Sequence, residues 1–148
     1  MSETVDLLQD VEQEIYLEPA SVGQRFLNFL IDLVLFFILI FGFGFVGGFI
    51  WGESFIYALE TMNPIVDRIL TSLLFALYIS VIEGLTKGRT LGKLITKTKA
   101  VTTYNEPTTW ANSFGRGFSR IVPFEALSAF GGNPWHDKWT DTKVVKVG

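Results

Sequence analysis

Two long segments of the chain lack charged residues, and polar residues lie around them. Residues 33–52 form the first segment, and residues 69–82 form the second, between Arg68 and Glu83. A helix rises ~1.5 Å per residue, so the first segment is long enough to span the ~30 Å hydrocarbon core of a bilayer. The second reaches this length as residues 65–85, with the Arg68 side chain extended to the interface and Glu83 facing protein or water. The pattern predicts two transmembrane helices, because helices buried in soluble proteins rarely stay uncharged for so long.

Capping signals mark the ends of these helices. Ser21 is a candidate N-cap for the first helix, which we expect to end near Trp51. Asn63 and Pro64 indicate a turn or the start of the second helix.

Small residues recur at helical spacing in both segments. In the first helix they are Gly44, Gly48 and Gly52, and in the second they are Ser72, Ala76 and Ser80. Such spacing lets another helix approach closely, so we expect the second set to pack against the first span. The glycines either form a contact face or only loosen a phenylalanine-rich helix. Because two or three helices are too few to enclose a permeation path, we predict a homo-oligomer or a partner membrane protein.

A third hydrophobic region, residues 110–135, is amphipathic and interrupted. Arg116 and Arg120 share one helical face, and apolar residues crowd another: Phe114, Phe118, Ile121 and Val122. Prolines and glycines after residue 122 disfavour a continuous crossing, so we expect an interfacial helix leading into a bent or re-entrant segment. The arginines would then face anionic headgroups or a protein partner. The predicted fold is an all-α membrane protein, a small helical bundle with two full transmembrane helices and this third region.

Two short segments alternate as strands do. Residues 93–103 read KLITKTKAVTT, and residues 142–147 read TKVVKV. The first is either an extended linker on the headgroups or part of a short hairpin. The second could pair with it on the cytoplasmic surface.

The net charge of -3 hides an asymmetry along the chain. All charged side chains in residues 1–20 are acidic. We assign these residues to an acidic cytoplasmic tail that precedes a membrane domain at 21–148. Five bases follow the second span: Lys87, Arg89, Lys93, Lys97 and Lys99. The positive-inside rule makes this loop cytoplasmic, so both termini would be cytoplasmic in a multi-pass protein of the inner membrane. Bases confined to one face are not typical of a nucleic-acid binder, so the predicted environment is the lipid bilayer.

Charged and polar residues lie at the start of the first span. Arg25, Asn28 and Asp32 share one helical face, with Arg25 and Asp32 about 10.5 Å apart along the axis. A charge at membrane depth is costly, so each should pair with a group on another segment. We expect Asp137 to lie beside Arg25 or Arg89, and Asp32 to meet a basic or polar group from residues 84–120.

Three stretches in order resemble one family. They are GQRFLNFLIDLVL at 23–35, EGLTKGRTLGKLITKTKAV at 83–101 and HDKWTDTKVV at 136–145. They resemble the RDD family of small bacterial and archaeal membrane proteins, named for an arginine and two aspartates that match Arg25, Asp32 and Asp137. The resemblance implies an integral membrane protein, and some family members have been linked with sodium-for-proton antiport.

Two functions remain open for the charged residues expected at the cytoplasmic side of the bundle: Arg25, Asp32, Glu83, Arg89, Lys93, His136 and Asp137. Partly desolvated carboxylates can exchange a proton for a monovalent cation, which would make the cluster a transport site. The alternative is a structural clamp in a non-transporting scaffold or accessory subunit, whose basic loop engages anionic lipids or a partner. We expect His136 to be a hydrogen-bonding interface residue rather than a proton relay.

Several chemistries find little support in the sequence. The chain has no cysteine and one histidine, which excludes thiolate sites and a multi-histidine metal cage. The GRTLGK stretch at 88–93 lacks the spacing and the strand–loop–helix context of a phosphate-binding loop, so we expect a turn beside the membrane. No nucleophile–base pair or dinucleotide fingerprint is present, so neither catalysis nor a cofactor is expected.

Overall fold

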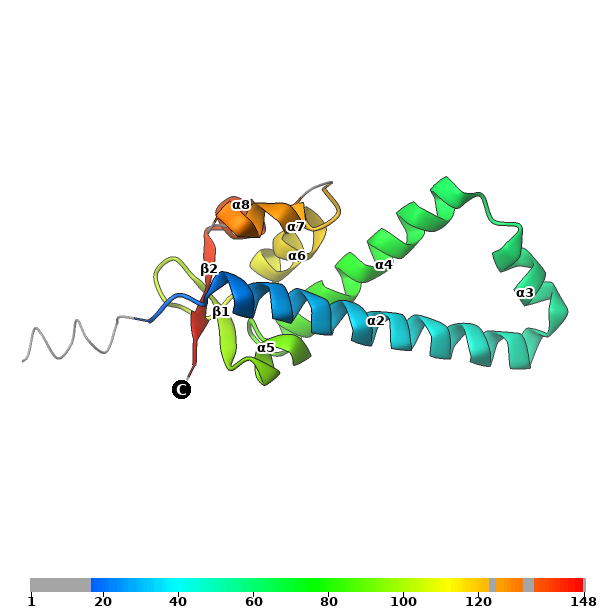
Figure 1. Cartoon of the computed structure of the whole chain (residues 1–148), viewed down its shortest axis with the longest axis horizontal. Coiled ribbons are helices and arrows are strands. Elements are labelled where there is room, and N and C mark those ends of the chain that lie inside the picture. The colour runs from blue at the N-terminus through cyan, green and yellow to red at the C-terminus, as the bar shows by residue number, and fades with distance from the viewer. Residues whose placement is uncertain (1–16, 123–124, 132–134, 148) are drawn as a thin grey trace, which may run out of the picture.

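A computed structural model describes residues 17–122, 125–131 and 135–147. Its two longest helices are α2 (Val22–Trp51) and α4 (Pro64–Leu85), and both are long and apolar enough to cross a membrane. Helix α3 (Glu53–Glu60) joins their far ends, and α2 and α4 diverge toward it (Figure 1). The prediction of a helical membrane protein with two long spans is confirmed.

The ends of both spans follow the capping signals in the sequence. Ser21 and Gln24 form a capping box at the start of α2, because each side chain accepts a hydrogen bond from the other's backbone amide. Asn63 caps α4 through the Ile65 amide, at 2.9 Å, and Pro64 is the first helical residue. Gly52 does not extend α2; it has a φ of 65° and turns the chain into α3.

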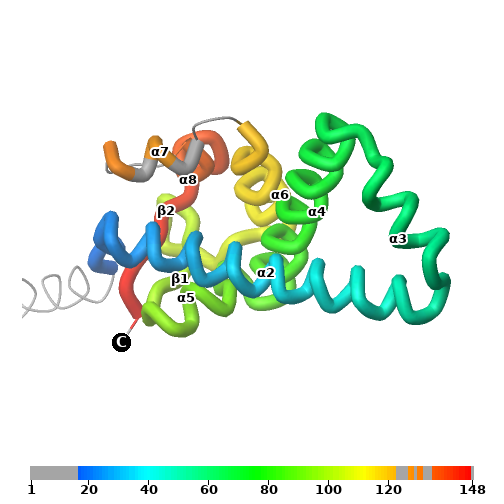
Figure 2. The backbone as a smooth tube through the Cα atoms, turned by 45° about the vertical axis from the view of Figure 1, so that its right-hand side comes forward, coloured from blue at the N-terminus to red at the C-terminus, as the bar shows by residue number. Residues whose placement is uncertain are grey.

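The remaining elements gather around the first half of α2 and the end of α4 (Figure 2). They are α5 (Leu91–Ile95), β1 (Thr98–Thr102), α6 (Trp110–Ser119), α7 (Glu125–Ser128), the 3-10 turn η1 (Ala129–Gly131), α8 (Trp135–Trp139) and β2 (Thr142–Lys146). We call the described residues from 88 onward the headpiece. Helix α6 has ten residues, α7 has four and η1 has three. The described part of the region that begins at Trp110 is therefore made of short elements, as its prolines and glycines predicted.

A small antiparallel sheet is the exception in this mostly helical chain. Strands β1 and β2 pair with Thr98 opposite Lys146 and Thr102 opposite Thr142, which confirms the predicted pairing. Residues 18–20 extend the sheet: the Lys146 amide donates to the Glu18 carbonyl and the Ala20 amide to the Val144 carbonyl. The folded part therefore includes the last residues assigned to the acidic tail. The rest of that predicted tail, residues 1–16, lies outside the described residues.

Two of the three small residues of α4, Ala76 and Ser80, pack against α6 and not against α2 as expected. A Cβ built on Gly117 of α6 would lie 2.6 Å from the Ala76 carbonyl oxygen and would collide with Ser80. Toward α2, by contrast, Phe75 meets Phe36, with ring centroids 5.2 Å apart. The expectation about these small residues was wrong because a close approach needs small residues on both helices, and α2 presents aromatic rings where it meets α4.

The three glycines proposed as a packing face make little contact within the chain. No described residue lies within 4 Å of a Cβ built on Gly44, and one on Gly48 would meet only the end of Ile56. The close approach in this part of α2 occurs instead at Gly47, against the Phe55 ring. A role for the three glycines between chains stays a prediction.

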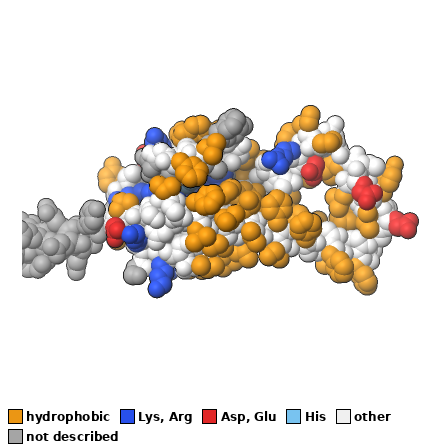
Figure 3. All heavy atoms as spheres, in the orientation of Figure 1, with side chains coloured by type: hydrophobic (Ala, Val, Ile, Leu, Met, Phe, Trp, Pro, Cys, Tyr) orange, Lys and Arg blue, Asp and Glu red, His pale blue; other side chains and the backbone are white. Residues whose placement is uncertain are grey.

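Large apolar side chains lie mostly on the surface, and the buried side chains are mostly polar, as expected of a membrane protein. Hydrophobic side chains cover the visible face of the molecule along α2 and the adjacent headpiece (Figure 3). Helix α6 illustrates the pattern: Phe114 and Phe118 on its apolar face are exposed, while Ser113, Arg116 and Gly117 are buried. Polar groups point inward because they find hydrogen-bond partners there, whereas apolar side chains lose nothing by facing hydrocarbon.

Candidate functional site

Arg116 lies at the centre of a buried charge network. Helix α6 places it against the end of α4, and its side chain is fully buried. Its Nε donates to Oε2 of Glu83 at 2.9 Å, and its Nη1 donates to Oδ1 of Asp137 and to the Thr142 hydroxyl, at 2.6 Å to the latter. One guanidinium therefore links α4, α6, α8 and β2. Burial opposes its charge, but Glu83 and Asp137 more than offset this and raise the pKa of Arg116.

Glu83 also binds a second cation. Its Oε1 accepts a hydrogen bond from Nζ of Lys93, which lies in α5 with a side chain only 2% exposed. Burial lowers the pKa of Lys93 to about 8, with help from the repulsion of Arg116, and the Glu83 carboxylate limits this shift. The carboxylate of Glu83 thus accepts hydrogen bonds on both oxygens from buried cations.

Asp137 joins the first span to the network. Its Oδ2 lies 3.8 Å from Nη1 of Arg25 in α2, and it accepts no hydrogen bond from the described residues. His136 Nε2 lies 3.4 Å from Oδ1 of Asp137. Burial lowers the pKa of His136 well below its usual value, and nearby arginines and Lys93 lower it further, so the imidazole is neutral at neutral pH. We call Arg25, Glu83, Lys93, Arg116 and Asp137 the charge network.

Asp32 is buried beside this network but binds neutral groups. Its Oδ2 accepts a hydrogen bond from the Thr90 hydroxyl at 2.6 Å, and its Oδ1 accepts one from the Gly92 amide at 2.9 Å. This confirms the expectation of a polar partner from residues 84–120. One helical turn earlier, the Asn28 amide group hydrogen-bonds the hydroxyls of Thr96 and Thr98. Together these contacts fasten α5 and β1 to α2.

The glycine at position 92 permits this attachment. A Cβ at Gly92 would lie 2.5 Å from the Asn28 carbonyl oxygen and 3.0 Å from its Cα. Only glycine lets the start of α5 approach the α2 backbone closely enough for its amide to reach Asp32. The GRTLGK stretch, expected to be only a turn, therefore begins a short helix after Thr90.

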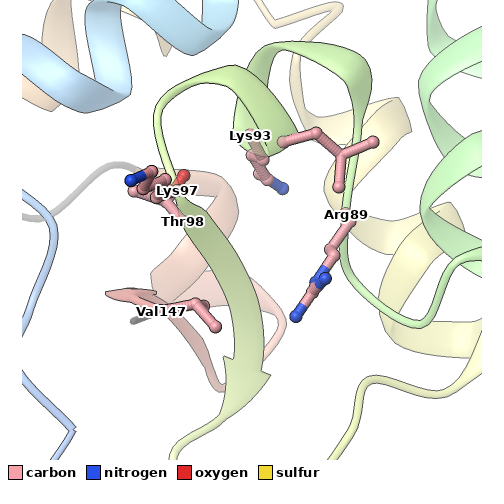
Figure 4. A pocket seen from close by; sticks show the side chains of 6 residues that line it. Arg89, Lys93, Lys97, Thr98 and Val147 are labelled. Atoms are coloured by element: carbon pink, nitrogen blue, oxygen red, sulfur yellow. The ribbon is translucent and has the colours of Figure 1, made fainter.

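Arg89 is the one predicted cluster residue that the fold directs elsewhere. Its guanidinium forms no ion pair with any described residue, and it lines a separate 120 Å³ pocket with Lys93, Lys97 and Val147 (Figure 4). The side chain points toward β1 and toward Val147, just after β2 (Figure 4). The expectation that Asp137 lies beside Arg25 or Arg89 is thus met by Arg25.

Arg116 was not among the predicted site residues, and its predicted position was wrong. We expected this arginine to face headgroups or a partner, yet its side chain has no exposed surface. A signal was present: glycines flank Arg116 on both sides, and Ser113 lies one turn away. Small residues around a charge indicate a face built for close packing, where a charge needs a buried partner.

The geometry supports charge pairing more than cation or metal binding. Three cations, Arg25, Lys93 and Arg116, surround two carboxylates, so the network repels an added cation. Among the described residues, no three His, Asp or Glu side chains lie together as metal ligands would.

Comparison with known families identifies the family to which the chain belongs. The family model for the RDD family matches residues 19–141, which is most of the chain and includes the whole charge network and Asp32. No curated protein and no solved structure matches the chain. The pattern of an arginine and two aspartates joined to two apolar helices, together with this match, identifies the chain as a member of the RDD family of membrane proteins.

Proposed function

We propose that the protein is a non-transporting, non-catalytic membrane scaffold or accessory subunit in which the charge network is a structural clamp. The observation that carries this proposal is the position of Arg116. Fully buried, it holds Glu83 of a span and Asp137 of the headpiece at the same time. Removing one member of such a buried pair strands the other, so the clamp keeps the headpiece attached to the spans.

The alternative, cation and proton exchange, has weaker support. An exchanging carboxylate must be able to release its protein partners and take up a cation. Both oxygens of Glu83 and of Asp32 accept hydrogen bonds from protein donors. The surplus of cations in the network also disfavours a sodium ion beside it.

We propose that the headpiece is cytoplasmic and that the protein lies in the inner membrane with both termini in the cytoplasm. Two exposed bases follow the second span, Lys87 just before the headpiece and Lys97 within it. The exposed acids Glu53, Glu60 and Asp67 lie at the opposite end, around α3. This asymmetry is the one that the positive-inside rule describes.

We further propose that the protein works as a homo-oligomer or bound to a partner membrane protein. The spans diverge toward α3, and large apolar side chains such as Phe45 and Phe49 are more than three-quarters exposed. Gly44 offers a nearby position where another helix can come close.

Sodium-dependent proton flux in proteoliposomes tests the clamp against the transport alternative. We expect no flux above that of protein-free liposomes for the parent. Flux in the parent that is lost in Asp32→Asn and kept in Asp67→Asn, with all proteins correctly inserted, would establish transport. Asp67 is the matched control because it is an exposed aspartate in the first turn of α4, at the end of the molecule away from Asp32 and the charge network.

A further inference from the structure

A cavity of about 370 Å³ is lined by residues of both spans and by Arg120 at the end of α6. Its walls include four phenylalanines, Phe29, Phe36 and Phe37 of α2 and Phe75 of α4. Ligand pockets in proteins have volumes of ~300–1,000 Å³ and are mostly apolar with a few polar groups. The size and the lining of this cavity fit that description.

Two arginines also line the cavity, one from each side. Arg68 comes from the first turns of α4, and Arg120 caps the end of α6. Neither guanidinium forms an ion pair with a described residue, and Nε of Arg120 is buried without a hydrogen-bond partner among those residues. Neither belongs to the charge network.

Such an arrangement calls for an anion. A cation at membrane depth is costly unless an opposite charge compensates it. Glu83 acts on Arg120 through space, but both of its oxygens already bind Lys93 and Arg116. The guanidinium group is suited to carboxylate and phosphate oxygens because it donates parallel hydrogen bonds to them. The phenylalanine walls favour a ligand whose remaining part is hydrocarbon.

We infer that this cavity binds an anionic amphiphile, with a carboxylate or phosphate head between Arg68 and Arg120 and a hydrocarbon body against the phenylalanines. Phe37 is exposed at the cavity, so the hydrocarbon body can continue into the bilayer. Both a free fatty acid and an anionic phospholipid have this chemistry. The inference goes beyond the clamp and does not depend on it, because it uses different residues.

Equilibrium binding to the purified full chain in nonionic detergent tests the inference. The probes are oleate, dodecyl phosphate and the uncharged oleyl alcohol. We expect saturable binding of at least one anion and at least tenfold weaker binding of the alcohol. Arg120→Gln and Arg68→Gln should each weaken anion binding about tenfold, which corresponds to 1.4 kcal/mol. Arg89→Gln is the matched control and should bind as the parent does, because Arg89 lines a different pocket.

A second variant tests the cavity without removing a charge. Ser72 lines it, so Ser72→Phe should fill the space and abolish anion binding. Tighter binding of oleate would indicate a fatty acid, and tighter binding of dodecyl phosphate a phospholipid; either result supports the inference. Equal affinity for the alcohol, or anion binding that survives both the arginine and the Ser72 substitutions, would overturn it.

Discussion

Arg116 shows at the residue scale how a lipid environment inverts the usual meaning of a charged position. Spaced four residues from Arg120 on an amphipathic helix, it resembles a residue of a solvated face. The pattern of a helix gives its two faces but not which of them points inward when the surrounding medium is apolar. Arg25, Asp32 and Asp137 could be predicted as buried partners because they adjoin long uncharged segments or match the family pattern. Arg116 has neither cue.

Substitution of Arg116 should be among the most damaging changes in the chain. Arg116→Gln leaves Glu83 and Asp137 short of a buried partner, so we expect the free energy of unfolding to fall by about 3–5 kcal/mol. Glu83→Gln should cost a similar amount, and the double variant much less than the sum. Denaturant titration in detergent gives the free energy of unfolding of the parent, of the two single variants and of the double variant. Arg89→Gln should change stability by no more than about 0.5 kcal/mol, and additive losses at 116 and 83 would refute the coupling.

His136 should make the fold sensitive to acid. Its pKa is below 6.5 in the folded chain, while the unfolded chain takes up a proton near 6.5. Below that pH the unfolded state binds more protons, so the free energy of unfolding falls as the pH falls, by up to about 1.4 kcal/mol per pH unit. Unfolding titrations between pH 7 and 5 should therefore have a smaller pH dependence in His136→Gln than in the parent. Identical slopes would show that His136 does not stay neutral in the fold.

At the scale of elements, the sequence is informative where local signals suffice. Ser21 and Asn63 cap helix starts by accepting hydrogen bonds from backbone amides two or three residues later, and Pro64 is the first residue of α4. The alternation in residues 142–147 predicts the strand that pairs with β1. The packing of α4 against α6 was missed because it depends on which small residues meet in space. Gly117 provides that meeting point and lies 37 residues after Ser80, beyond the reach of periodicity.

The contact between α5 and α2 provides a test of close packing. Gly92→Ala places a Cβ 2.5 Å from the Asn28 carbonyl oxygen, so the helices must separate and weaken the hydrogen bond from Gly92 to Asp32. We expect a loss of about 1–3 kcal/mol in the free energy of unfolding. Gly44→Ala is the control, because no described residue lies near its added methyl group. A Gly92→Ala protein as stable as Gly44→Ala would contradict the observed approach.

At the scale of the whole molecule, the two ends differ in charge and in architecture. The headpiece contains the network and the sheet, and the opposite end consists of α3 and the divergent ends of the spans (Figure 1). The sequence predicted the two spans and the acidic and basic loops, since hydropathy and charge are local quantities. How the headpiece folds back onto the spans could not be read from it, because Arg116 joins groups 33 and 21 residues away.

The orientation of these ends can be measured by cysteine labelling, since the chain has no cysteine of its own. Thr61, after α3, and Tyr104, in the headpiece, are both exposed. In intact cells a membrane-impermeant maleimide should label Thr61→Cys and leave Tyr104→Cys unlabelled until the membrane is opened. The reverse pattern would place the headpiece outside the cell.

The most direct test of the clamp is amide hydrogen exchange in Arg116→Gln reconstituted in nanodiscs. The clamp predicts that β1 and β2 exchange about 100-fold faster than in the parent, because the headpiece opens more readily, while α2 retains its protection. Arg89→Gln should exchange as the parent does. Unchanged exchange of both strands in a correctly inserted Arg116→Gln protein would contradict the account, because the network would then not be what holds the headpiece to the spans.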